Sequence, residues 1–280
     1  MLEKILGTLI MLVCMSLSTS FVKETPSPIP PHNVGTNENV GTEITDETSP
    51  IIPYTECLEL TNKFPHNAES FTQGLFFHDG QMYETTGRYK QSKIYKSINV
   101  ENGIAANEYV FSDDIFAEGS VVFKDKLYVL TYREQQAQVF DPVTLGHITT
   151  YSYPRQGWGL TTDGNYLIAG DGTSTLYFLD ENLNTVKQLT VTDGNTSFAN
   201  INELEYINGE IWANQWLTNR ILIIDPENGK VKRIIDFTGM FTPKSTDNDA
   251  VLNGIAYNAS TDKLYITGKL WETLFEFSIK

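Results

Sequence analysis

The sequence has little cysteine and lacks the motifs of several common enzyme classes. Only two cysteines occur in 280 residues, and Cys14 lies in an apolar N-terminal segment, which leaves Cys57 alone. One thiol can build neither a disulfide framework nor a cysteine-based zinc site. The four histidines are scattered without an H-E-x-x-H pattern, and the sequence contains no G-x-S-x-G turn and no P-loop. These absences argue against a zinc hydrolase, a nucleophile-elbow hydrolase and a P-loop nucleotide enzyme.

Basic residues are also scarce. Lysine and arginine number 20 against 35 acidic residues, which gives a formal charge of −15. An acidic surface repels both nucleic acid and anionic membranes, so neither is expected as a partner. Hydrophobic residues make up 40% of the chain and aromatic residues 12%, which is enough for a sizeable core.

No hydrophobic run is long enough to span a bilayer. The apolar run Ile5–Val13 follows Lys4 and precedes small residues at Ser18–Ser20, a pattern typical of a secretory signal peptide. We therefore predict a signal peptide over residues 1–20 and an exported, secreted or periplasmic, protein whose mature domain does not insert into a membrane. An uncleaved anchor and a lipid on Cys14 remain alternatives.

Residues 21–53 differ in composition from the rest of the chain. This stretch holds six of the eleven prolines, together with Ser, Thr, Asn, Gly and acidic residues. Its apolar residues are too sparse to offset chain entropy by burial. We expect a disordered tether that precedes a folded domain over residues 54–280.

The folded part shows short strands and no helical periodicity. Runs rich in Tyr, Leu, Ile, Val and Trp are bounded by Asp-Gly, Asn-Gly or Asp-Lys turns. The expected strands include 126–131, 165–169, 175–179, 210–213, 220–224 and 263–267. The pattern predicts an all-β domain.

Five segments repeat one design, in which a turn with a glycine leads into an apolar strand, a polar turn and an aromatic strand. Their aligned positions are Gly74, Gly119, Gly159, Glu203 and Gly254, with spacings of 45, 40, 44 and 51 residues. A period in the forties with several strands per repeat is the signature of propeller blades. The repeats predict a five-bladed β-propeller.

Equivalent positions of such blades converge at one mouth of the central channel. The residues preceding the aligned positions are Gln73, Glu118, Trp158, Asn202 and Asn253. The residues four positions after the aromatic residue of the second strand are Gly87, Tyr132, Gly170, Trp216 and Lys269. This predicts a pocket in which a buried carboxylate exchanges protons near neutral pH, while amides and a lysine polarise a carbonyl group.

Structural roles explain the same residues and stay open from the sequence. Glu118 and Lys269 are able to pair as a buried salt bridge, and Asn202 and Asn253 to bond backbone groups at strand ends. Trp158 and Trp216 could simply pack in the core, and Gln73 could be a hydrogen-bonded turn residue. Convergence on one repeat position favours the functional interpretation.

The motifs resemble those of the plant-type glutaminyl cyclases, a family that also occurs in bacteria. The resemblance runs in order through the whole domain, in "FTQGL" (71–75), "EGS" (118–120), "GWGL" (157–160), "INELEYINGEIWANQW" (201–216) and "LNGIAYN…LYITGKLW…LFEF" (252–277). It implies a glutaminyl-peptide cyclotransferase, an acyltransferase that converts an N-terminal glutamine to pyroglutamate and releases ammonia. It further implies peptide or protein substrates and no cofactor required for catalysis. A structural metal stays an open question, and we expect a monomer.

The resemblance also assigns roles residue by residue. Glu118 matches the acidic catalytic residue, and Asn202 and Lys269 match the pocket amide and lysine. Residues Phe71, Gln73, Trp158 and Trp216 match substrate-binding positions, to which the repeat adds Asn253. Tyr132 departs from the pattern, because a tryptophan is expected there, and this puts the pocket's size in question.

Two other functions fit the same propeller. A calcium-dependent hydrolase, such as a lactonase, would use Glu118, Asn202 and Asn253 as oxygen ligands. Such enzymes usually have six blades and a further aspartate, whereas the matching positions here hold Gln, Trp and Lys. A non-catalytic peptide-binding propeller is the second alternative.

Overall fold

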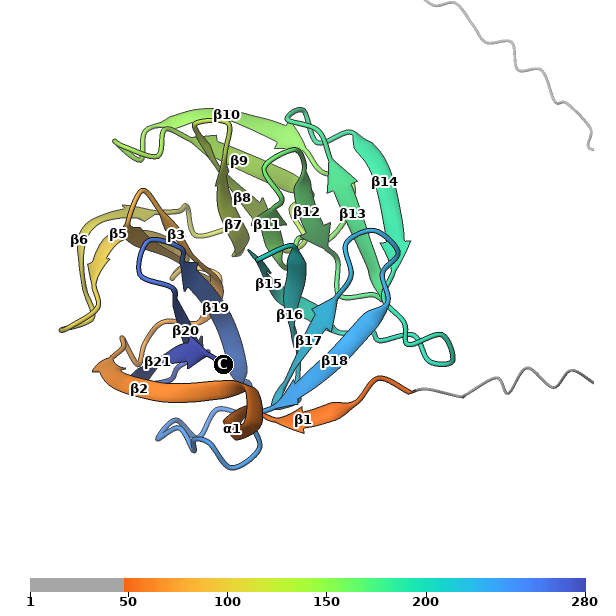
Figure 1. Ribbon diagram of the computed structural model, residues 1–280. Coiled ribbons are helices and arrows are strands. Elements are labelled where there is room, and N and C mark those ends of the chain that lie inside the picture. The colour runs from red at the N-terminus through yellow and green to blue at the C-terminus, as the bar shows by residue number, and fades with distance from the viewer. Residues whose placement is uncertain (1–47) are drawn as a thin grey trace, which may run out of the picture. The chain divides into compact units, whose positions relative to one another are not determined.

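The computed structural model describes residues 48–280, in which five β-sheets are arranged around a common centre (Figure 1). The innermost strand of each sheet contacts those of its two neighbours around the ring. The expected all-β, five-bladed β-propeller is confirmed. The predicted signal peptide and most of the predicted tether lie outside the described residues.

Each of blades 1 to 4 contains four antiparallel strands that follow one another in sequence from the centre outward. Blade 1 has β3 (Thr72–His78), β4 (Gln81–Thr86), β5 (Lys93–Asn99) and β6 (Ile104–Val110). Blade 2 has β7 (Ala117–Phe123), β8 (Lys126–Thr131), β9 (Gln136–Phe140) and β10 (His147–Ser152). Blade 3 has β11 (Leu160–Thr162), β12 (Leu167–Gly170), β13 (Thr175–Leu179) and β14 (Thr185–Thr190). Blade 4 has β15 (Ile201–Ile207), β16 (Glu210–Gln215), β17 (Arg220–Ile224) and β18 (Val231–Asp236).

Blade 5 combines both parts of the chain and closes the ring. It contains β19 (Leu252–Asn258), β20 (Lys263–Gly268), β21 (Thr273–Ile279) and, as its outer strand, β2 (Leu58–Pro65). The pairing of β2 with β21 sets Leu60 opposite Phe277. Opening blade 5 from blade 1 therefore requires breaking a sheet as well as separating side chains.

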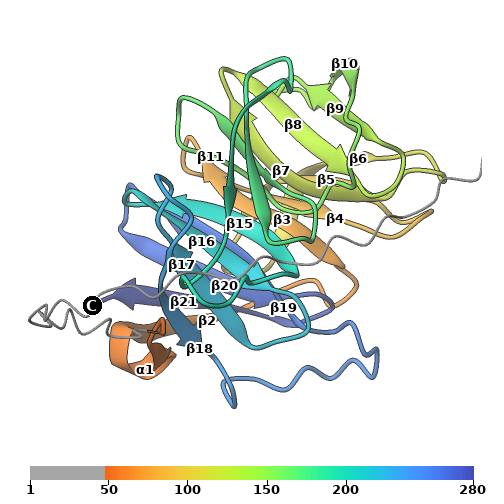
Figure 2. The same cartoon turned by 90° about the vertical axis from the view of Figure 1, so that its right-hand side faces the viewer.

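The ordered domain begins earlier than the sequence predicted. Strand β1 (Ile51–Pro53) pairs in parallel with β18, and the short helix α1 (Tyr54–Cys57) leads from it to β2. Both views place α1 beside β18 and β2 (Figure 1, Figure 2). The tether was expected to reach residue 53. The pairing of Ile51–Ile52 with Ile234–Ile235 overrides the local proline-rich composition, because backbone hydrogen bonds to a sheet edge satisfy an extended segment.

The repeated glycines are explained by close approach of the innermost strands. A Cβ at Gly159 would lie 1.9 Å from the carbonyl oxygen of Asn202, and one at Gly119 would lie 2.4 Å from that of Trp158. Only glycine fits where two backbones come this close. The glycines therefore allow neighbouring blades to meet at the centre.

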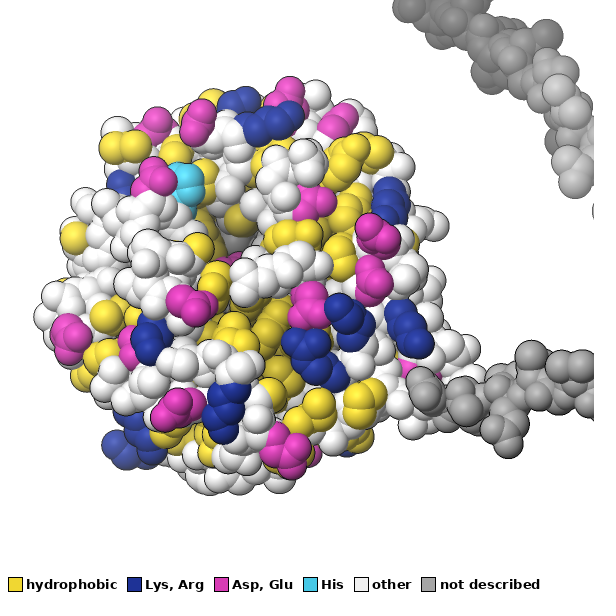
Figure 3. Space-filling model, viewed as in Figure 1, with side chains coloured by type: hydrophobic (Ala, Val, Ile, Leu, Met, Phe, Trp, Pro, Cys, Tyr) yellow, Lys and Arg dark blue, Asp and Glu magenta, His cyan; other side chains and the backbone are white. Residues whose placement is uncertain are grey.

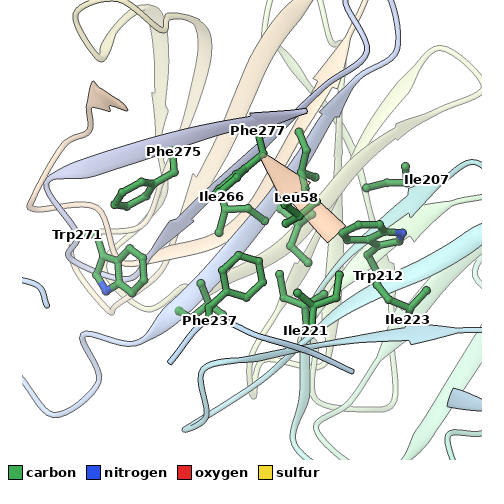
Figure 4. Close-up of a cluster of buried hydrophobic side chains, with 14 residues drawn as sticks. Leu58, Ile207, Trp212, Ile221, Ile223, Phe237, Ile266, Trp271, Phe275 and Phe277 are labelled. Carbon is green, nitrogen blue, oxygen red and sulfur yellow. The ribbon is translucent and has the colours of Figure 1, made fainter. Parts of the chain in front are cut away.

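Apolar side chains fill the space between neighbouring blades. In Figure 4, Trp212, Ile221 and Ile223 of blade 4 face Ile266 and Phe277 of blade 5. These residues are at most 2% exposed, so the contact excludes water and holds the two sheets in a fixed relation. The fixed blades in turn hold the ends of the innermost strands in place.

Candidate active site

A cavity of about 280 Å³ collects residues from four of the five innermost-strand ends. Its lining comprises Phe71, Gln73, Arg88, Phe116, Glu118, Tyr132, Trp158, Asn202, Trp216, Asp249 and Lys269. Eight of the nine residues singled out from the sequence are in this set. Figure 3 shows the face of the ring on which the C-terminus lies (Figure 1), where acidic and basic side chains are interspersed. The segment between β18 and β19, which supplies Asp249 to the cavity, lies on the opposite side (Figure 2).

The lining residues lie at two kinds of strand end. Gln73, Glu118 and Asn202 are near the starts of β3, β7 and β15, and Trp158 precedes β11. Tyr132, Trp216 and Lys269 directly follow the ends of β8, β16 and β20. Because inner and second strands are antiparallel, the start of one lies beside the end of the other, and both sets meet at one mouth.

The structure corrects the expectation for Asn253, which does not line the cavity. The Asn253 Nδ2 atom donates to the carbonyl oxygen of Thr72 at 2.8 Å, and the side chain is fully buried. This bond joins β19 to β3 across the seam between blades 5 and 1. The three ligands that a calcium-dependent hydrolase would need therefore do not share one pocket.

Glu118 and Lys269 are the two charged residues of the cavity lining that are almost fully buried. They are 5% and 4% exposed. Burial raises the pKa of the Glu118 carboxyl well above its usual value, and the charge of Lys269 opposes this shift. Burial lowers the pKa of Lys269 to about 8, against the opposing charges of Glu118 and Asp249. Both groups are thereby brought toward neutral pH, where proton transfer is easiest.

These two side chains are not a tightly paired salt bridge. No ion pair within 4 Å joins them among residues 48–280, and no hydrogen bond of that region reaches the Glu118 carboxylate. The Lys269 Nζ atom lies 4.7 Å from the centre of the Phe71 ring, a cation–π contact. Both charged groups are therefore placed to interact with a molecule in the cavity.

Two amides in the cavity have polar atoms without partners. Gln73 and Asn202 are each 2% exposed, and Gln73 Oε1 and Asn202 Oδ1 accept no hydrogen bond in the described part of the chain. The indole Nε1 of Trp216 is likewise buried without an acceptor. Unpartnered buried polar atoms are costly in a folded protein, and a bound polar ligand would satisfy them.

Aromatic rings form two walls of the cavity. Trp158 and Trp216 meet edge to face with ring centres 5.6 Å apart. On the other side Phe116 contacts Phe71 at 6.2 Å and Tyr132 at 5.5 Å. Such walls suit the short aliphatic part of a small polar substrate and limit the entry of water.

Three lining residues were missed in the sequence. Phe116 stands two residues before Glu118, as Phe71 stands two before Gln73, so the repeat carried a signal for it. Arg88 directly follows Gly87, which is one of the repeat positions that the sequence placed at the pocket. Asp249 comes from the irregular segment between β18 and β19, where the repeat offers no equivalent.

Comparison with known proteins identifies the family to which the chain belongs. Residues 39–279 match the family model described as glutamine cyclotransferase. The chain belongs to the glutamine cyclotransferase family. A glutaminyl-peptide cyclotransferase of Arabidopsis thaliana is 31% identical over 230 residues, which cover 80% of this chain and 71% of that protein. The crystal structure of Myxococcus xanthus glutaminyl cyclase has a TM-score of 0.75 and 32% identity, covering 80% of this chain and 96% of the other.

Family membership confirms the enzyme class that the motifs implied. The protein is an enzyme of the glutaminyl-peptide cyclotransferase family, whose activity forms pyroglutamate from an N-terminal glutamine. Peptides that begin with glutamine are accordingly its class of substrate. Within residues 48–280 no cluster of three or more His, Cys, Asp or Glu residues is arranged to hold a metal, and no helix is long and apolar enough to cross a membrane.

Proposed function

We propose that this cavity cyclises N-terminal glutamine through one shuttling acid–base, Glu118. Three features support the assignment: its burial, its raised pKa and the absence of a hydrogen-bond donor to its carboxylate in the described chain. A peptide α-amine has a pKa of about 8. A carboxyl group whose pKa is shifted toward that value exchanges a proton with the amine at little cost.

The chemical steps follow from this proton transfer. Glu118 accepts a proton from the α-amine, whose lone pair forms a bond to the carbon of the side-chain carbonyl. The same carboxyl group then donates the proton to the amide nitrogen as the carbon–nitrogen bond breaks and ammonia leaves. Lys269 and Asn202 stabilise the carbonyl oxygen while it carries negative charge, and Gln73 orients the amide.

The aromatic walls supply proximity. Phe71, Tyr132, Trp158 and Trp216 surround a space of about 280 Å³, which suits a glutamine side chain folded back over its own amine. When the cavity holds the two reacting groups together, most of the entropy loss of ring closure occurs on binding. The chemical step then has a lower barrier. In this mechanism the protein's own side chains perform every proton transfer, and no metal or cofactor takes part.

The proposal is tested on the peptide Gln-Ala-Ala-amide by mass spectrometry, which detects the loss of one ammonia. The Glu118→Gln variant should lose about a thousandfold in kcat while it keeps the wild-type melting temperature. Glu134→Gln is the matched control, because Glu134 acts on Glu118 only through its charge and is not among the residues that line the cavity. Full turnover in Glu118→Gln would remove Glu118 from the mechanism.

We further propose that the protein is exported and works as a monomer. The export proposal is supported by the signal-peptide pattern of residues 1–20. N-terminal analysis of the protein recovered outside the cytoplasm would distinguish a cleaved leader from a retained or lipid-linked one. Light scattering of the purified protein measures the oligomeric state.

A further inference from the structure

Four charged side chains line the cavity, two of each sign, but one of the basic residues is paired with an acidic residue outside it. Arg88, Glu118, Asp249 and Lys269 line it, and Arg88 is already paired with Asp247 just outside, at 2.5 Å. The remaining groups are two carboxyls and one amine. With Lys269 protonated and both carboxyls ionised, one negative charge is left over, and moving the proton from Lys269 to Glu118 leaves this sum unchanged.

The surplus charge belongs to Asp249. Burial raises the pKa of the Glu118 carboxyl, so a proton from Lys269 or from a bound amine moves readily to Glu118, whereas the side chain of Asp249 is only half-buried. No ion pair or side-chain hydrogen bond involves the Asp249 carboxylate within residues 48–280. Its negative charge does reach Lys269, whose pKa it raises, so the carboxylate faces the same space.

The position of Asp249 is fixed by its surroundings. Its backbone N–H donates to Asp247 Oδ1 at 2.9 Å, and the other oxygen of Asp247 holds Arg88. Its carbonyl oxygen accepts from Val251 N at 2.8 Å, and the Trp271 indole donates to the carbonyl oxygen of Ala250. The carboxylate is therefore held at the cavity by blades 1 and 5 together.

Other charges near the mouth do not change the balance. Arg133 contacts the Tyr132 hydroxyl at 3.1 Å, and Glu134 accepts a hydrogen bond from Tyr89, so this rim adds one charge of each sign. The unpartnered oxygens of Gln73 and Asn202 are two further acceptors inside the cavity. The whole space is thus arranged to receive a cation with N–H donors.

We propose that Asp249 binds the α-ammonium group of the incoming glutaminyl peptide and thereby selects charged substrate over uncharged product. The inference builds on the proposed function, because an N-terminal glutamine arrives mostly as an ammonium ion at neutral pH. Cyclisation removes two protons from that ammonium group: one reaches the leaving amide nitrogen through Glu118, and the other is released to solvent, where it can protonate the ammonia. The lactam nitrogen that remains carries no charge. The contact is therefore lost on reaction, and the product leaves more readily than the substrate.

The test uses two ligands of equal length that cannot cyclise. One is Gln-Ala-Ala-amide with a dimethylated α-nitrogen, which is charged at about pH 6, keeps one N–H donor and cannot form a lactam. The other is its Nα-acetylated, uncharged counterpart. Wild-type enzyme should bind the charged ligand about tenfold more tightly, as expected for one half-buried charge contact. In Asp249→Asn this ratio of inhibition constants should fall to about one, while the affinity for the acetylated ligand stays the same.

A matched control removes a negative charge from a neighbouring groove outside the cavity. Asp171 borders a groove next to Trp158 and Trp216 without lining the cavity, and Asp171→Asn should keep the wild-type ratio. For the reactive peptide, Asp249→Asn should raise KM about tenfold and leave kcat near the wild-type value. These readouts separate recognition of the ammonium group from the chemical step.

Two results would overturn the inference. One is an unchanged ratio in Asp249→Asn, and the other is equal affinity of the wild-type enzyme for both ligands. Neither result would contradict the proposed function. That proposal is contradicted if the wild-type enzyme releases no ammonia from Gln-Ala-Ala-amide.

Discussion

Glu118 and Glu203 are two buried carboxyl groups that the fold treats in opposite ways. They are 5% and 1% exposed, and burial raises the pKa of both. The carboxylate of Glu203 accepts the backbone N–H of Ile255 at 2.9 Å and that of Leu75 at 3.3 Å. The carboxylate of Glu118 accepts no hydrogen bond from the described residues, and its strongest charged neighbour is Lys269 in the cavity.

The difference shows that a shifted pKa alone does not mark a catalytic group. Glu203 occupies the repeat position that holds glycine in the other four blades, and its longer side chain reaches from blade 4 to blades 1 and 5. Both of its oxygens are used to join blades. A buried carboxyl group becomes available for chemistry when its oxygens are left free and an open cavity lies beside them.

Among the variants that test this contrast, Glu203→Ala is expected to have the largest effect, which is a loss of stability. The substitution leaves the N–H groups of Leu75 and Ile255 buried without an acceptor, at a cost of about 3 kcal/mol in the free energy of unfolding. For a domain of this size the melting temperature should fall by about 10 °C. Below that temperature kcat should stay close to wild type, the reverse of Glu118→Gln. A stable but inactive Glu203→Ala would break the contrast.

Much of this arrangement could be predicted because it repeats. The spacing of Gly74, Gly119, Gly159 and Gly254 identified the five blades, and the strands at 126–131, 175–179 and 220–224 were predicted with the bounds that the structure has. Repetition also located the mouth, since one position per blade necessarily meets its equivalents at the centre. Local pattern and periodicity are sufficient for these features.

The missed features depend on contacts between distant parts of the chain. Nothing in the segment 58–65 indicates that it pairs with 273–279, and the strand at 51–53 forms only against blade 4. Asn253 has the correct repeat position, but a bond to Thr72 holds its amide away from the cavity. Asp249 lies outside the repeat, so its approach to Lys269 follows only from the path of the loop between β18 and β19.

A second, smaller test concerns Glu205, which lies two residues beyond Glu203 on the same strand. Burial raises its pKa to about 8 from a usual value of 4.5. Between these values the folded state binds more protons than the unfolded state, so stability is greatest at low pH and falls as pH rises through 8. Glu205→Gln cannot ionise, and its melting temperature should fall less than that of wild type between pH 5 and pH 9.

The pH series also checks the role of this group. Glu205 accepts the N–H of Tyr257 at 3.0 Å, and a glutamine oxygen can accept the same bond. We therefore expect normal turnover in Glu205→Gln at every pH. An equal pH slope in both proteins would show that ionisation of Glu205 does not limit stability, and a shifted pH profile of kcat would connect it to the cavity.

The smallest effect is expected at Tyr132, where the family resemblance calls for tryptophan. Its ring contacts Phe116 at 5.5 Å, and the Arg133 guanidinium lies 4.7 Å above it. Tyr132→Trp enlarges one wall but moves no proton, so kcat should change by about threefold or less. The change should appear in KM and depend on the size of the second residue, measured with Gln-Ala-amide and Gln-Phe-amide. Tyr132→Phe is the control, because it keeps the ring and loses only the hydroxyl contact with Arg133. A loss of kcat as large as in Glu118→Gln would mean that the Tyr132 side of the cavity takes part in the reaction. Carboxylate oxygens without hydrogen bonds would then no longer be the feature that distinguishes catalytic residues from structural ones.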